Sequence, residues 1–154
     1  MRLGDEPHGE RILGDRGSLG DEPLELQSHH HLGRVRPMTL LHEIAHARAG
    51  DKGNRLNVSV IAYHPDLWPL IHDQVTEARV LDLFRHRGAS QVKRYELPNL
   101  HALNFVIDAV LEGGVNASLN LDIHGKTNSF RVLGLEIEIP PDLLRHLTAY
   151  RSAP

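Results

Sequence analysis

The sequence predicts an α+β domain in which two helices pack on one face of a mainly antiparallel sheet. Three observations predict it: short segments that alternate apolar and polar residues, segments whose apolar residues recur at helical spacing, and turns rich in glycine and proline between them. The predicted order is two strands, a helix, a strand, a helix, two strands and a terminal helical turn. Strands interrupted by helices in this way are typical of helices on one side of a sheet.

The first two predicted strands form a hairpin. Residues 40–49 are compatible with a strand, and residues 56–62 alternate apolar with polar side chains, as a half-buried strand does. The turn between them contains Gly50 and Gly53, which tolerate the left-handed backbone angles that tight turns need.

A helix in two pieces and a third strand follow. Pro65 stands at a favourable position in the first turn, Thr76 caps the second piece, and Gly88 ends it. The apolar residues at helical spacing in these pieces are Leu67, Ile71, Val75, Ala78, Leu81 and Phe84. Residues 92–97 then form a short predicted strand, which Pro98 ends because proline lacks the N–H that a sheet ladder needs.

The second predicted helix begins at Asn99, whose amide side chain suits the cap of a helix N-terminus. Its apolar stripe comprises Leu103, Val106, Ile107, Val110 and Leu111. Two consecutive glycines, at positions 113 and 114, end this helix. Two further strands are predicted at residues 119–123 and 133–139, joined by a turn at residues 124–126.

Residues 1–37 are predicted to be a disordered leader that precedes a folded domain at residues 38–154. The pentapeptide LGDEP occurs twice in the leader, and its leucines follow neither a helical nor a strand period. Such a segment buries too little apolar surface to offset its ordering entropy. Met38 directly precedes the patterned region, so we expect it to be the true start. The three histidines at 29–31 are expected to belong to a solvated linker, and adventitious metal binding is the alternative.

Composition and charge exclude several classes of function. The formal net charge of the 154 residues is -3, which gives no electrostatic basis for binding nucleic acid or an anionic membrane. Because the chain has no cysteine, it has no disulfide, no thiolate metal site and no cysteine nucleophile. It has neither an apolar run of the roughly 20 residues that cross a bilayer nor a signal peptide pattern, so a cytoplasmic location is expected.

The segment His42-Glu43-Ile44-Ala45-His46 matches the HExxH signature of zinc proteases. On a helix, the two histidines share one face and bind a single zinc ion. This segment instead runs into a predicted hairpin, and residues four apart on a strand lie roughly 13 Å from one another. We therefore predict neither a metal site nor a cofactor for this chain, and a zinc hydrolase is a remote alternative.

Three stretches of the sequence are long and specific: ARAGDKGN at residues 47–54, RYELPNLHALNF at residues 94–105, and a third that comprises Gly113-Gly114-Val115, Ser118, Asp122 and Gly125-Lys126. They resemble the signature stretches of the C-terminal domain of the AtuA (acyclic terpene utilisation) family. The resemblance implies a ferredoxin-like sandwich and a setting among genes for the breakdown of acyl-CoA and of branched or terpenoid acids. This domain occurs behind a large AtuA domain or as a separate chain, and this sequence resembles the separate form.

Polar residues of these stretches form the candidate site. Lys52 lies in the predicted hairpin turn, and His101 lies at the predicted helix start, where free N–H groups suit a carboxylate or phosphate. Lys52 adds a positive charge and His101 is a candidate general acid or base, so both are predicted to be catalytic. The residues expected to bind the ligand or a partner beside them are Arg48, Asp51, Asn54, Asn99, Asn104, His124 and Lys126. Capping or turn formation is the structural alternative for Asn99 and Asp51.

This interpretation of the sequence leads to two functional hypotheses. In the first, the chain is an accessory subunit that docks on a larger AtuA-type chain. In the second, it contributes catalytic residues to a lyase or hydratase site on an acyl-CoA or a small carboxylic acid. A self-sufficient enzyme is disfavoured, because a domain of this size shows a single short polar cluster. A homo-oligomer is the alternative assembly.

Overall fold

The computed structural model describes residues 37–147, so the prediction for the leader falls almost entirely outside the described residues. The strands are β1 (Met38–Leu40), β2 (Ala45–Lys52), β3 (Arg55–Ala62), β4 (Val92–Leu97), β5 (Ala102–Ile107) and β6 (Glu136–Glu138). The α-helices are α1 (Trp68–Gln74), α2 (Glu77–Phe84) and α3 (Asn128–Leu133). The 3-10 turns are η1 (Leu41–Glu43), η2 (Pro65–Leu67), η3 (Arg85–Arg87), η4 (Pro98–Leu100) and η5 (Pro141–His146).

The main sheet has four strands in the order β2-β3-β5-β4, and every neighbouring pair is antiparallel. Strands β2 and β3 form the predicted hairpin, in which Ala45 pairs with Ala62 at one end and Lys52 with Arg55 at the other. Strands β1 and β6 form a separate antiparallel pair. The α+β class and the predominantly antiparallel pairing are confirmed.

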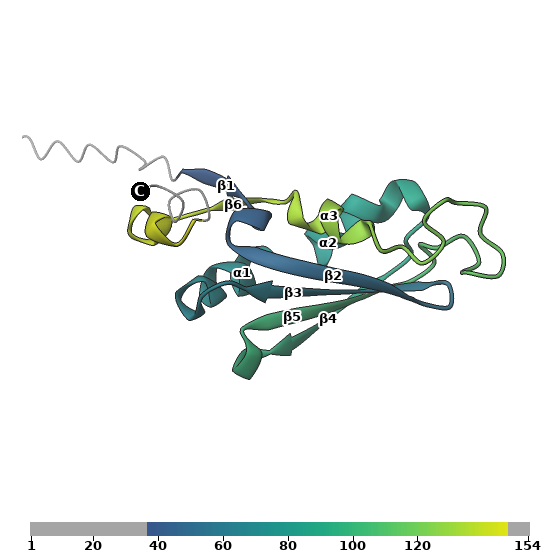
Figure 1. The fold of residues 1–154 in the computed structure, drawn as a ribbon, viewed down its shortest axis with the longest axis horizontal. Helices are drawn as coiled ribbons and strands as arrows, with labels where there is room; N and C mark the ends of the chain where they lie inside the picture. The colour runs from purple at the N-terminus through teal and green to yellow at the C-terminus, as the bar shows by residue number, and fades with distance from the viewer. Residues whose placement is uncertain (1–36, 148–154) are drawn as a thin grey trace, which may run out of the picture. The chain divides into compact units, whose positions relative to one another are not determined.

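Figure 1 shows α2 and α3 on one side of the main sheet, and all three α-helices contribute buried residues to the core on one face of that sheet. Alternate residues of the strands, such as Val58, Val60 and Phe105, are fully buried on that face. They belong to one apolar cluster with Ile71 of α1 and Val132 of α3. The two-piece helix is confirmed: Thr76 accepts a hydrogen bond from the backbone N–H of Arg79 (3.3 Å), and Gly88 has a φ of 81°. No helix of residues 37–147 is long and apolar enough to cross a membrane.

The predicted helix that begins at Asn99 is wrong, because residues 102–107 form strand β5 and η4 precedes it. The apolar residues of this segment fit both periods: Leu103, Phe105 and Ile107 alternate toward the core, and all three are fully buried. Phenylalanine and β-branched residues favour the strand. Asn99 therefore caps no α-helix, and the free N–H groups expected beside it are not formed there.

The last two predicted strands are also largely wrong. Residues 119–123 form an irregular loop, in which the side chains of Leu119 and Leu121 are fully exposed. Their alternation with polar residues is therefore no sign of burial. Residues 133–139 begin at the end of α3, and only residues 136–138 within them form a strand, β6.

Candidate functional site

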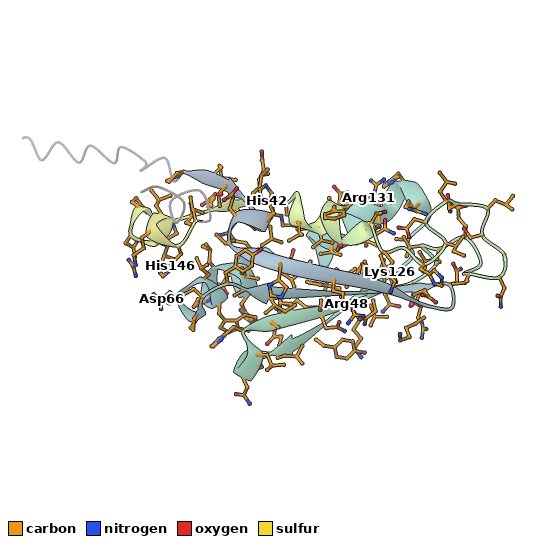
Figure 2. The ribbon with its side chains drawn as sticks, viewed as in Figure 1. His42, Arg48, Asp66, Lys126, Arg131 and His146 are labelled. Carbon is orange, nitrogen blue, oxygen red and sulfur yellow. The ribbon has the colours of Figure 1, made fainter. Side chains whose placement is uncertain are left out.

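A polar pocket of about 300 Å³ lies at the edge of the main sheet, around Gly50 of strand β2. We call it the Gly50 pocket. Its lining residues are Arg48, Ala49, Gly50, Asp51, Lys52, Asn57, Ser59 and Lys126. Figure 2 shows Arg48 and Lys126 on neighbouring parts of the molecule at this edge.

Strand geometry brings most of the lining together. Ala45 and Ala49 of β2 are buried in the core, so the alternating positions Arg48, Gly50 and Lys52 lie on the opposite, uncovered face. The register then places Gly50 beside Asn57 and Arg48 beside Ser59 of β3. Asn57 and Ser59 were not among the predicted site residues. Their alternation in the hairpin, opposite Arg48 and Gly50, is the signal from which they could have been found.

Lys126 reaches the pocket from the loop that joins β5 to α3. A Cβ atom added to Gly50 would lie 3.3 Å from the Lys126 ammonium nitrogen, so glycine at this position makes room for the lysine. The turn that carries Lys126 is held by Asp122, which accepts hydrogen bonds from the backbone N–H groups of Lys126 (2.9 Å) and Thr127 (2.8 Å). It also accepts one from the Thr127 hydroxyl (2.6 Å).

The electrostatics of this turn follow from those hydrogen bonds. Partial burial raises the pKa of Asp122, but the bonds from Thr127 and Lys126 outweigh it, and the net effect is a pKa below the ordinary value. The next glycine, Gly125, has a φ of 65° and is buried, so the turn also depends on a residue without a side chain. Asp122 and Gly125 of the third signature stretch therefore shape the turn that presents Lys126.

Asp51 and His124 form a pair at the rim of the pocket, with 3.0 Å between the Asp51 carboxylate and His124 Nδ1. The hydrogen bond from His124 is the main cause that lowers the pKa of Asp51, and the positive charge of Lys126 adds to it. An ionised carboxylate only accepts hydrogen bonds, so Nδ1 carries the proton. In the neutral imidazole, Nε2 then keeps its lone pair and can accept a proton.

The pocket is suited to an anion. Three cationic side chains, Arg48, Lys52 and Lys126, line it, and its one carboxylate, Asp51, is bound to His124. Positive charges that converge on a polar concavity favour a carboxylate or a phosphate, and guanidinium and ammonium groups are the usual partners of both.

The structure divides the predicted site residues into two groups. Arg48, Asp51, Lys52 and Lys126 line the Gly50 pocket, and His124 is joined to it through its contact with Asp51. The remaining predicted residues are Asn54, Asn99, His101 and Asn104.

The expected convergence of Lys52 with His101 is wrong. Lys52 pairs with Arg55 at the hairpin turn, whereas the carbonyl of His101 accepts a hydrogen bond from Ala62 at the far end of β3. Strand β3 has eight residues, so these two ends are more than about 20 Å apart. His101 has a φ of 48° and its ring lies 6.5 Å from that of Trp68.

The other predicted residues also lie outside the pocket. The Asn54 side chain accepts hydrogen bonds from the N–H groups of Leu111 (3.2 Å) and Gly113 (2.9 Å), which fixes a loop. Asn104 lies on the uncovered face of β5, beside Ser59 of β3 and therefore about 10 Å from Arg48 across the strands. Asn99 is exposed in η4.

The HExxH segment does not form the helix that its signature requires. His42 lies in η1 and His46 in β2, where its ring stacks on Tyr63 at a centroid distance of 5.5 Å. The prediction that both histidines lie on one strand is therefore wrong for His42, which lies in η1 and is labelled in Figure 2.

The comparisons with known proteins bear on the fold and on this site. A model of the AtuA ferredoxin-like domain matches residues 39–138, a range that contains the Gly50 pocket. No curated protein and no solved structure matches the chain. The family match covers well over half of the sequence, and it confirms the ferredoxin-like class that the signature stretches imply. The chain belongs to the AtuA ferredoxin-like domain family.

Proposed function

We propose that this chain is a cytoplasmic accessory subunit that acts with a larger AtuA-type chain in the breakdown of acyl-CoA or of branched or terpenoid carboxylic acids. In this role, the Gly50 pocket binds the anionic group of the substrate. The observation that carries the proposal is the convergence of Arg48, Lys52 and Lys126 on one pocket whose carboxylate is already bound.

The size and polarity of the pocket limit what it binds. A volume of about 300 Å³ holds a carboxylate or a phosphate group with a few neighbouring atoms, and not a whole acyl-CoA. The long remainder of such a substrate would therefore extend over the uncovered sheet face or onto a partner. This favours a subunit that completes a shared site over a self-sufficient enzyme.

Two exposed leucines support a partner. Leu119 and Leu121 are fully exposed in the same loop that carries His124 and Lys126. Single exposed apolar residues are common on protein surfaces, but two in one loop that also supplies a pocket residue suit an interface that buries them on assembly.

Ligand mapping tests the anion site. We expect a titration of the 15N-labelled chain with coenzyme A, and separately with butyrate, to shift the amide resonances of Gly50, Lys52 and Lys126. The shifts should weaken between 50 and 300 mM salt, because screening reduces the attraction between exposed charges. Shifts confined to the other end of the sheet, around His101, would contradict the proposal.

Co-expression with a large AtuA-type chain from the same genome tests the accessory role. Leu119→Asp with Leu121→Asp should abolish co-elution of the two chains on size-exclusion chromatography. Leu100→Asp is the matched control, because Leu100 is also exposed, at 65%, but lies in η4. If the chain self-associates and does not bind the larger chain, the result would favour the homo-oligomer instead.

The Asp51–His124 pair favours a second candidate function, in which the subunit supplies a general acid or base to a lyase or hydratase site. A carboxylate that orients an imidazole through Nδ1 leaves Nε2 for proton transfer. In the reconstituted complex, His124→Gln should then lower kcat by a factor of at least about 100 and leave KM nearly unchanged. An unchanged kcat would show that His124 is not a general acid or base in this reaction.

A further inference from the structure

A cluster of two imidazoles and one carboxylate lies apart from the Gly50 pocket, at the end of β3 that is distant from the hairpin turn. His64 caps η2, Asp66 lies within η2, and His146 ends η5. No sequence motif connects them, because the two histidines are 82 positions apart. Figure 2 shows Asp66 and His146 next to each other.

The three side chains face one another with the spacing of ligands to one ion. His146 Nε2 lies 3.1 Å from Asp66 Oδ2, and His64 Nδ1 lies 3.6 Å from the same oxygen. One potential ligand atom from each residue lies within 4.8 Å of the others. Ligand atoms about 2.0–2.2 Å from a tetrahedral zinc ion are roughly 3.4 Å apart, so small side-chain rotations suffice to close the site.

The arrangement of the two imidazole rings, and the lone pair on His64 Nδ1, suit a metal ion. The His64 ring stacks on the His146 ring at a centroid distance of 4.1 Å, which holds them side by side next to Asp66. His64 Nδ1 accepts a hydrogen bond from the backbone N–H of Asp66 (3.2 Å), so this nitrogen carries a lone pair. Metal binding through Nδ1 would replace that hydrogen bond with a coordinate bond. The His146 side chain is 11% exposed, which limits the water that competes for its nitrogen.

One cation competes for the carboxylate. Arg145 Nη2 lies 3.3 Å from Asp66 Oδ2, and a bound metal ion would be repelled by its charge. The Arg145 side chain is 61% exposed, however, and an exposed ion pair contributes little, so the guanidinium can turn into water at small cost. Arg145 is therefore expected to weaken metal binding without preventing it.

We propose that His64, Asp66 and His146 bind one divalent transition-metal ion, which joins the η5 turn to η2. Two imidazoles and one carboxylate match the ligands that zinc, cobalt and nickel prefer, whereas magnesium and calcium prefer oxygen ligands throughout. With three protein ligands, the ion keeps at least one position for water. The site is independent of the Gly50 pocket and of the proposed function.

Zinc titration of the untagged full chain tests this inference. The histidine run at residues 29–31 is a second source of binding, so the reference protein carries alanine at those three positions. We expect this reference protein to bind one zinc ion per chain and to melt several degrees higher with excess zinc, because a ligand of the folded state stabilises it. Loss of all zinc binding in the reference protein would assign the ion to the histidine run and overturn the proposal.

Substitutions in the reference protein locate the ion. His146→Ala should weaken zinc affinity at least tenfold and remove the zinc-dependent rise in Tm. His64→Ala should also weaken zinc affinity and remove the rise in Tm. This variant replaces His146→Ala as the test if His146→Ala fails to fold, because the His64 side chain is more exposed than that of His146. Arg145→Gln should tighten binding. His72→Ala is the matched control, since His72 lies 3.0 Å from the carboxylates of both Asp73 and Glu96 but outside the cluster. Equal losses from His72→Ala and His64→Ala would contradict the proposed site.

Discussion

Gly125→Ala should destabilise the domain strongly, because the turn that presents Lys126 has no room for a side chain. An added Cβ would lie 2.7 Å from Leu56 Cδ1 and 2.8 Å from Leu111 Cδ2. Both leucines are buried in the core, at 0% and 1% exposure, so neither can move away freely. Overpacking of this kind costs about 1–3 kcal/mol, and the left-handed backbone angle at φ 65° adds about 1–2 kcal/mol for alanine.

Gly53→Ala is the matched control for this substitution. Gly53 has nearly the same backbone angle, φ 67°, but an added Cβ would have no atom within 4 Å. It should therefore lose only the backbone contribution, about 1–2 kcal/mol. The free energy of unfolding from urea titration, and Tm from circular dichroism, measure the difference between the two variants. We expect Gly125→Ala to melt roughly 5–15 °C below Gly53→Ala. Equal Tm values would refute the packing argument.

Three further predictions concern the loops and the carboxylates. Ala109 is exposed with a φ of 60°, so Ala109→Gly should stabilise the domain by about 0.5–1 kcal/mol. Ala78→Gly is the control, because Ala78 lies in the exposed part of α2, where glycine should cost about 1 kcal/mol. Urea titration measures the free energy of unfolding of both variants. Asp122→Ala removes three hydrogen bonds and should cost about 1–2 kcal/mol by the same assay, with an unchanged midpoint counting against its role in the turn. The lowered pKa values of Asp51 and Asp122 give stability that is present above pH 3.8 and lost as the pH falls through the folded-state values. The urea midpoint should therefore drop as the pH falls below 3.8, and by less in Asp122→Asn.

The N-terminal half of the fold could be predicted from the sequence because local signals there agree with the tertiary structure. The second strand of the hairpin alternates cleanly, and the two-piece helix has a capping threonine and an ending glycine at the observed positions. In the segment after Pro98 the signals conflict. Leu103, Phe105 and Ile107 fit a strand, while Leu103, Ile107 and Val110 fit a helix, and pairing with β3 decides in favour of the strand.

The candidate site was predicted in part for the same reason. Arg48, Asp51 and Lys52 lie within five consecutive positions of the sequence, so their proximity can be predicted without knowledge of the tertiary structure. Lys126 joins them through a loop whose path depends on tertiary packing, such as the fit of Gly125 against Leu56. The sequence predicts His101 beside Lys52 because it predicts a helix start at Asn99. Once that segment is a strand, the sheet register sends His101 to the opposite end.

The affinity of coenzyme A for two matched lysine variants tests the central claim most directly. Lys126 lines the Gly50 pocket, whereas Lys93 of β4 lies outside it, with its ammonium 5.1 Å from the centre of the Tyr95 ring. Both substitutions to glutamine remove one positive charge from an exposed lysine, so they change the net charge equally. Calorimetric titration at low salt should give a Kd roughly five- to tenfold weaker for Lys126→Gln, equivalent to about 1–1.4 kcal/mol, and a nearly unchanged Kd for Lys93→Gln. Equal weakening by both variants would show that coenzyme A responds to net charge alone, and would contradict an anion site at the Gly50 pocket.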